Sequence, residues 1–177
     1  SDAGDPAALA VTLRTMRRRV FIQTLSRDLT GRADLAEVCA NMTTLAEVAL
    51  RAAVVLHHRL LAAEHGEPRD ERGNAQSLVV IGMGKLGGRE LNYSSDIDLL
   101  FVYEPDDEED QAQHAVFHKL GRVLFTLMTE FSDEGSLYRV DLRLRPMGRR
   151  GSIAYSLRQH LQYYDAWGET FERFALI

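Results

Sequence analysis

Apolar residues in the first third of the chain recur at helical spacing. From Leu9 to Leu29 they follow at steps of three to five, which predicts a helix that ends near Gly31. A second series, at steps of three and four, predicts a longer helix with Asp34 as its N-cap and Glu37 three residues later. Its members are Leu35, Val38, Met42, Leu45, Ala49, Ala52, Leu56 and Leu60. Such a stripe is typical of a surface that packs against other elements.

The pattern changes to that of strands between residues 77 and 104. An apolar run leads into the glycine-rich segment 82–88, one short helical turn is expected, and a second apolar run follows. This second strand opens with Asp96 and Asp98. Because side chains on a strand alternate between its faces, both carboxylates are expected on one face. The other face, toward the core, would carry Ile97, Leu99 and Phe101.

Residues 137–146 also alternate with a period of two, which predicts a strand with one buried face. The apolar face would carry Tyr138, Val140, Leu142 and Leu144. The opposite face would carry Leu137, Arg139, Asp141, Arg143 and Arg145. An acid among guanidinium groups suits a site for metal and phosphate together, since arginine offers phosphate a planar fork of donors. A salt-bridged outer face is the alternative interpretation.

The remaining segments complete an α+β pattern. Helical periodicity over residues 116–131 predicts a helix that covers the apolar face of the sheet, and Ser156 is expected to cap a helix that runs to Tyr164. The predicted fold is a small mixed sheet with a helix packed on it, flanked by helical segments. The expected regions are an N-terminal helical region (1–65), a linker (66–76), a core that carries the acids (77–151) and the start of a C-terminal helical region (152–177). An acidic loop is expected over residues 104–113.

Composition and charge narrow the class of protein. The chain is 45% hydrophobic and 27% charged, as ordinary soluble globular proteins are, and its formal net charge of −5 disfavours nucleic-acid binding. No run approaches the roughly 18 apolar residues of a membrane span, and no secretory signal opens the chain. The single cysteine, Cys39, forms no internal disulfide, which favours a reducing compartment. The chain begins without Met and stops within an apolar run, so an excised domain is expected.

The paired aspartates are the main chemical feature. Two carboxylates 4 Å apart repel by about 4 kcal/mol at an effective dielectric of 20. A shared proton or a bound divalent cation relieves such repulsion. We expect a cation held by Asp96 and Asp98, with Asp141 as the third ligand.

The segment from Gly82 to Gly87 matches the letters of a dinucleotide-binding fingerprint, G-x-G-x-x-G. Only eight residues separate Gly87 from Asp96, too few for the crossover helix that this fold requires. The segment is not a P-loop either, because Leu86 stands where Ser or Thr must bind magnesium. We expect a turn whose backbone N–H groups hold nucleotide phosphates. The expected phosphate-binding residues are Gly82, Gly84, Lys85, Arg89, Ser94, Ser95, Arg143 and Arg145, and a purely structural turn is the alternative for Gly87 and Gly88.

Several long sequence segments of this chain occur together in one known family. GMGKLGGREL, SSDIDLLFVY, YRVDLRLRPMGRRG and the closing YYDAWGETFERFA resemble the glutamine synthetase adenylyltransferase/deadenylylase family, over residues 78–104 and 137–175. The resemblance implies a nucleotidyltransferase (polymerase-beta-like) fold, with Mg²⁺ or Mn²⁺ at Asp96, Asp98 and Asp141. It also implies transfer of AMP to or from a tyrosine of glutamine synthetase. Addition uses ATP, and removal uses inorganic phosphate and yields ADP.

Family members carry two copies of this module, and SSDIDL with YRVDLRLRP looks like the N-terminal, deadenylylating copy. Two positions stand apart: Phe171 replaces an expected tryptophan, and neither copy predicts Met147. The resemblance implies a cytoplasmic enzyme with glutamine synthetase as its partner and, for the full-length parent, a PII-type nitrogen signalling protein. Two alternatives stay open: a nucleotidyltransferase for another small molecule or RNA, and a non-catalytic module that senses nucleotide and docks to glutamine synthetase.

Overall fold

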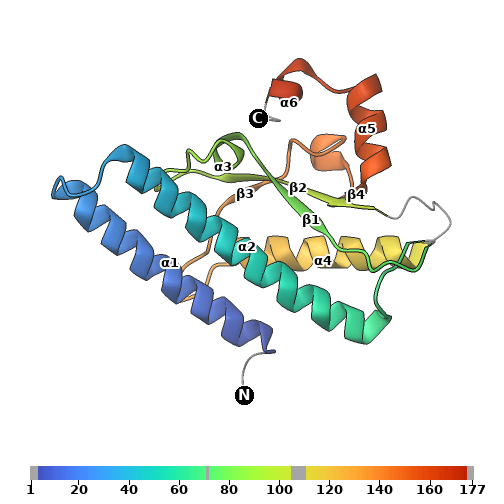
Figure 1. Cartoon of the computed structure of the whole chain (residues 1–177), viewed down its shortest axis with the longest axis horizontal. Helices are drawn as coiled ribbons and strands as arrows, with labels where there is room; N and C mark the ends of the chain where they lie inside the picture. Colours follow the sequence, from blue (N-terminus) through green and yellow to red (C-terminus); the bar gives the residue numbers. More distant parts are fainter. Residues whose placement is uncertain (1–3, 71, 105–110, 175–177) are drawn as a thin grey trace.

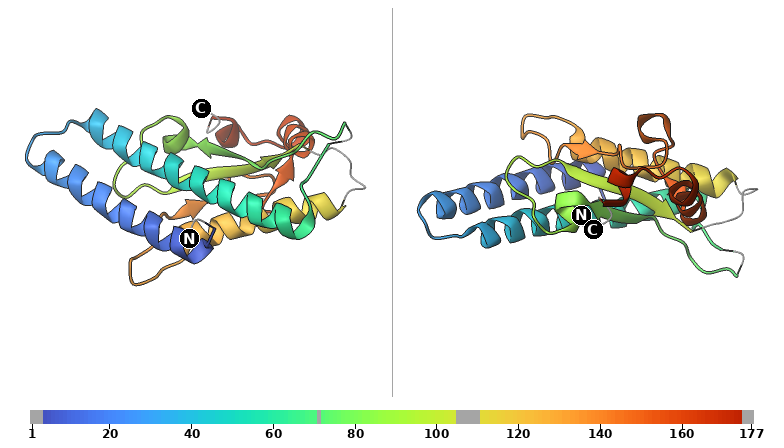
Figure 2. Two further views of the ribbon diagram at one scale, coloured as in Figure 1. Left: turned by 60° about the horizontal axis from the view of Figure 1, so that its bottom comes forward. Right: turned by 90° about the horizontal axis from the view of Figure 1, so that it is seen from above.

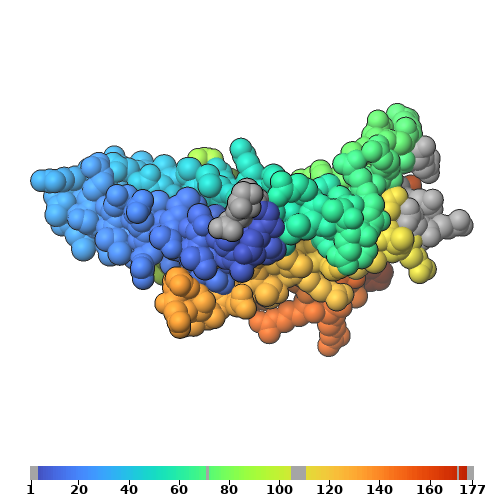
Figure 3. All heavy atoms as spheres, turned by 90° about the horizontal axis from the view of Figure 1, so that it is seen from below, coloured from blue at the N-terminus to red at the C-terminus, as the bar shows by residue number. Residues whose placement is uncertain are grey.

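The computed structural model describes residues 4–70, 72–104 and 111–174. A helical hairpin and a third long helix lie along one side of a small sheet, and two short C-terminal helices lie on the other side (Figure 1). The two turned views show the same arrangement (Figure 2). Seen from below, the hairpin covers most of the molecule (Figure 3). The observed architecture is α+β with a mixed sheet, as the sequence predicts.

The hairpin consists of α1 (Pro6–Leu29) and α2 (Leu35–His65). Asp34 caps α2 by accepting a 2.8 Å hydrogen bond from the backbone N–H of Glu37, so the predicted cap is confirmed. Arg27 near the end of α1 donates to the Glu37 carboxylate at 2.7 Å. This bond fixes the two helices at the point where the chain reverses.

The apolar side of α2 packs against both α1 and α4 (Gln111–Thr129). By length and composition α2 could cross a membrane, but here its apolar side lies in the core. The predicted apolar stripe of α2 is buried along most of its length. The prediction is wrong at its two ends, where Leu35 is 73% exposed and Leu60 is 37% exposed. At the C-terminal end the neighbouring Leu61, 6% exposed, is buried in place of Leu60.

The sheet has four strands around β2 (Ile97–Tyr103). β1 (Val79–Met83) pairs with β2 in the antiparallel direction, and the four-residue helix α3 (Gly84–Gly87) follows β1 directly. β3 (Val140–Asp141) pairs in parallel with the start of β2, and β4 (Tyr155–Ser156) pairs in parallel with its end. An antiparallel β1–β2 pair cannot belong to a parallel βαβ unit, so the exclusion of a dinucleotide-binding unit is confirmed.

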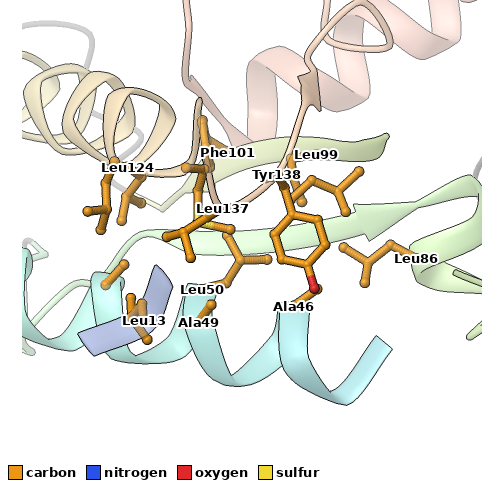
Figure 4. Close-up of a cluster of buried hydrophobic side chains, with 14 of the residues drawn as sticks. Leu13, Ala46, Ala49, Leu50, Leu86, Leu99, Phe101, Leu124, Leu137 and Tyr138 are labelled. Carbon is orange, nitrogen blue, oxygen red and sulfur yellow. The ribbon is translucent and has the colours of Figure 1, made fainter. Parts of the chain in front are cut away.

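The two faces of β2 differ as predicted. Ile97, Leu99 and Phe101 lie in the main core, together with residues of α2 and α4. Figure 4 shows side chains of α2 beneath this core, with Leu124 of α4 beside it. The opposite face carries a small second cluster of Met83, Leu100, Val102 and Leu144. Phe131 is 83% exposed because α4 ends at Thr129, so the predicted extension of this helix to residue 131 is wrong.

The predicted strand over residues 137–146 is confirmed only at Val140–Asp141, the two residues of β3. Leu137, expected on the polar face, is 1% exposed in the main core, and Leu144 lies on the opposite face. The cause is a turn after β3, in which the backbone N–H of Arg143 donates to Asp141 Oδ1 at 2.8 Å. The chain therefore leaves the sheet at Leu142 and returns only at β4.

The C-terminal part begins with a 3₁₀ helix, η1 (Gly148–Arg150), which follows Met147 in a left-handed conformation with φ 62°. Ser156 caps α5 (Leu157–Ala166) through a full capping box with Gln159, which confirms the predicted cap. α6 (Thr170–Phe174) is the last described element. Most of the predicted acidic loop, residues 105–110, lies outside the described residues, and its last three predicted positions belong to α4. The region boundaries at 66–76 and at 151 remain predictions.

The packing of α2 under the sheet generates a stability prediction. Ala49 of α2 is fully buried in the main core, whereas Ala40 on the same helix is exposed. Ala49→Leu should lower the free energy of unfolding by about 1–3 kcal/mol, the typical cost of overpacking a dense core. Ala40→Leu should stay within about 0.5 kcal/mol of the unsubstituted chain. Urea unfolding of both variants is the measurement, and equal effects would contradict this placement of α2.

Candidate functional site

Gly84 brings the turn after β1 close to β2, and Gly82, within β1, leaves room for Leu86 of α3. Gly84 has φ +52°, and a Cβ added there would lie 3.0 Å from Asp98 Oδ2. A Cβ at Gly82 would lie 2.8 Å from Leu86 Cγ. Side chains larger than hydrogen are therefore disfavoured at both positions. The predicted glycine turn places its backbone directly against the Asp98 carboxylate.

Asp98 and Asp141 are direct neighbours across the parallel β2–β3 pair. Paired residues share a sheet face, so both carboxylates lie on the side away from α2 and α4. The pKa of Asp98 is raised, first by burial and then by the negative charges of Asp141 and Asp96. Arg143 and Lys85 act in the opposite direction. Burial and the two neighbouring negative charges together disfavour the ionised form of Asp98 in the folded chain.

Two arginines hold the other two acids. Arg139 Nε donates to Asp96 Oδ1 at 2.5 Å, and its Nη2 donates to the carbonyl of Ser94 at 2.5 Å. Arg143 Nε donates to Asp141 Oδ2 at 2.6 Å, and this hydrogen bond is the main reason that the pKa of Asp141 is lowered. Asp96 and Asp141 thus have counterions within the chain, whereas Asp98 lacks a comparable ion pair among the described residues.

The predicted metal-ligand set is only partly assembled. In the part of the chain that the structure describes, no three His, Cys, Asp or Glu side chains are arranged to hold a metal ion. Asp98 and Asp141 lie together and Asp96 is near enough to raise the pKa of Asp98, but arginine bonds engage Asp96 and Asp141. The two arginine side chains are 71% and 64% exposed, so they are able to move without disturbing the core. The assignment of the three acids as metal ligands remains a prediction.

The loop before Asp96 contains three of the predicted phosphate-binding residues, and each has a different setting. Ser95 Oγ donates to Asn92 Oδ1 at 2.9 Å, so the hydroxyl is turned into its own loop. The backbone N–H of Ser94 donates to the same oxygen. Arg89 forms an ion pair with Glu47 of α2 at 2.7 Å and lines a separate groove beside α2. The structure therefore places Arg89 against α2, whereas Lys85 acts electrostatically on Asp98.

A cavity of about 650 Å³ adjoins Asp96 and Asp141. Arg143 and Arg145, both predicted from the sequence, line it, and Arg145 donates to the carbonyls of Leu142 and Gly151 at 3.0 and 3.4 Å. Burial lowers the pKa of Arg145. The sequence analysis missed four further polar lining residues: His118, Arg122, Arg149 and Ser152. The i, i+4 spacing of His118 and Arg122 indicates a shared helix side, but no local signal shows what that side faces.

The raised pKa of Asp98 generates a prediction about pH. A carboxyl whose folded pKa exceeds the unfolded value of about 3.9 destabilises the fold once pH rises above that value. Asp98→Asn should therefore raise the urea midpoint at pH 7 in a chelator, and this gain should vanish below about pH 3, where Asp98 is protonated in both states. Asp133→Asn, in an exposed turn, is the matched control and should show no such pH dependence. A gain independent of pH would contradict the charge repulsion.

The family model for glutamate-ammonia ligase adenylyltransferase matches residues 2–177. A protein of Thioalkalivibrio sulfidiphilus is 45% identical over 99% of this chain, and proteins of Burkholderia mallei and Ralstonia nicotianae are each 46% identical over 96% of it. All three are named bifunctional glutamine synthetase adenylyltransferase/adenylyl-removing enzyme. The chain spans 18–19% of the length of these relatives. Because the family model covers nearly every residue, the chain belongs to the glutamate-ammonia ligase adenylyltransferase family.

Proposed function

We propose that this chain is a metal-dependent nucleotidyltransferase module that moves AMP between nucleotide and a tyrosine of glutamine synthetase. The names of the relatives support the reaction class and the partner. The observation that carries the proposal is the register of β2 and β3, which sets Asp98 beside Asp141 against a glycine turn. Neighbouring carboxylates beside a glycine turn suit a site for a cation and phosphate oxygens.

The proposed cation is Mg²⁺ or Mn²⁺, with Asp96, Asp98 and Asp141 as the residues that would hold it. A donor set of carboxylate oxygens alone suits such hard ions. The cation would neutralise charge on the transferring phosphoryl group. In its absence, Arg139 and Arg143 neutralise Asp96 and Asp141, and their exposed side chains can release the acids at little cost to packing.

The glycine turn and its neighbours are the proposed contacts to nucleotide phosphates. Because Gly82 and Gly84 have no side chains, the backbone N–H groups of the turn could approach a phosphate closely. Lys85 adds positive charge that acts on Asp98. Ser94, Ser95, Arg143 and Arg145 are the further proposed contacts. Arg89 would have to leave Glu47 to take part. ATP and ADP are the proposed nucleotide substrates, which places the reaction in the cytoplasm.

The proposed direction is removal of AMP, with inorganic phosphate as acceptor and ADP as product. The segments SSDIDL and YRVDLRLRP, which resemble the N-terminal copy of the family, motivate this choice of direction. The same acids serve addition equally well, because only the nucleophile differs. A PII-type signalling protein is proposed as a further partner of a full-length parent.

The test is to mix the chain with adenylylated glutamine synthetase, phosphate and Mn²⁺ and to measure ADP. Asp96→Asn and Asp98→Asn should each lower ADP release by roughly a hundredfold, the scale of losing one electrostatic contact to a transition state. Asp133→Asn should leave it unchanged. Consumption of ATP with addition of AMP to unmodified enzyme would reverse the direction. Nucleotide binding without turnover in either direction would favour the sensor alternative.

Metal binding can be measured without turnover. Mn²⁺ should raise the melting temperature of the unsubstituted chain, because a ligand that binds only the folded state stabilises it. The rise should be lost in Asp98→Asn and kept in Asp133→Asn. Equal stabilisation of both variants would show that Mn²⁺ binds elsewhere.

A further inference from the structure

The cavity beside Asp141 is formed by an excursion of the chain out of the sheet. β2 pairs with β3 at its start and with β4 at its end, so residues 142–154 leave one edge and return to the same edge. Loop residues from Leu142 to Ile153 form one wall of the cavity. His118, Arg122 and Phe125 of α4 form the opposite wall. The cavity is therefore built jointly by a loop and a helix that are distant in sequence.

Positive charge dominates this cavity. Arg122, Arg143, Arg145 and Arg149 line it, against Asp96 and Asp141 as its only lining carboxylates among the described residues. Arg139 and Arg143 already engage these two acids. Of the four lining guanidinium groups only Arg143 is paired with one of these acids, so three are left without an ion pair to a carboxylate of the cavity.

The hydrogen bonds identify which arginines of the cavity still have N–H groups available to a ligand. Arg143 is bound to Asp141, and Arg145 is bound to two backbone carbonyls. Within the described ranges, Arg122 and Arg149 have neither a side-chain hydrogen bond nor a carboxylate within 4.0 Å. Arg145 adds a buried Nε with no partner among the described residues. Arg145 Nε therefore loses solvation without a compensating bond, whereas Arg122 and Arg149 are exposed and present their donors to solvent at the cavity.

His118 lines the cavity from α4, beside Arg122. Its pKa is lowered, first by burial and then by His114 and Arg122, while a hydrogen bond to the backbone of Ala154 acts in the opposite direction. Arg149 lies in the opposite wall, which the loop forms. The cavity thus favours negative charge from both of its walls.

We propose that this cavity is a binding site for a phosphate-class oxyanion, with Arg122 and Arg149 as its principal ligands. A guanidinium group matches phosphate oxygens through paired N–H donors. Two sources share this chemistry: free inorganic phosphate and the phosphate groups of a nucleotide, and a volume of about 650 Å³ admits either. That the bound anion takes part in a reaction rests on the function proposed above, but its binding does not.

The test measures binding of inorganic phosphate to the chain by calorimetry, in a chelator and without nucleotide. Arg122→Gln and Arg149→Gln should each weaken binding about tenfold, equivalent to about 1.4 kcal/mol. Arg19→Gln, with the same charge change on the exposed side of α1, is the matched control and should bind as the unsubstituted chain does. Circular dichroism melts of the three variants verify that each is folded.

Further titrations distinguish the source of the anion and separate this inference from the metal site. Weaker phosphate binding with unchanged ATP affinity would assign the cavity to free phosphate. Parallel loss of both affinities, with competition between them, would assign it to nucleotide phosphates. Asp98→Asn should lose the response to Mn²⁺ and keep phosphate binding, so failure of the proposed function would leave this result intact. Absence of saturable phosphate binding, or equal affinities of all three arginine variants, would overturn the inference.

Discussion

The side-by-side placement of Asp98 and Asp141 is the constraint around which this structure is arranged. The parallel register of β2 and β3 imposes it, and the packing of β2 prevents escape. Ile97 and Leu99 are buried in the main core, so rotating the strand to separate the acids would expose both. Hydrophobic burial on the opposite face of the same strand therefore offsets the free energy of carboxylate repulsion.

Arginine side chains supply most of the positive charge that compensates the acids, and they do so from exposed positions. Arg139 and Arg143 hold Asp96 and Asp141 from exposed positions, where ion pairs contribute little net stability. Such pairs separate at little cost in free energy. The pKa of Asp98 is raised by its burial and by the charges of the two flanking acids.

The α1–α2 hairpin supports the segments that carry the acids. Tyr93, three residues before Asp96, donates to Asp28 Oδ2 at 3.2 Å and packs edge-on against Phe21 at 5.2 Å. Tyr138, just before β3, donates to the carbonyl of Met42 at 3.3 Å. The helical region thus anchors both the loop before β2 and the approach to β3, so its role extends beyond covering the core.

Local features of this chain could be predicted from the sequence because they depend on neighbours within a few residues. The caps Asp34 and Ser156 satisfy N–H groups of their own helices, and the alternation of β2 follows from strand geometry. The proximity of Asp98 to the glycine turn follows from the short connection between β1 and β2. These elements contain most of the fold and the centre of the candidate site.

Other features depend on contacts that only the tertiary structure creates. Leu137 is buried and β3 ends after Asp141, because contacts with the distant α4 and a turn at Arg143 outweigh the alternating pattern. Arg89 pairs with Glu47, which lies 42 residues earlier. Arg122 reaches the cavity because α4 packs beneath the loop between β3 and β4. The sequence by itself determined the elements and their polar faces, since these follow from local geometry. Only the tertiary structure decided which charges meet, because that depends on how distant segments pack.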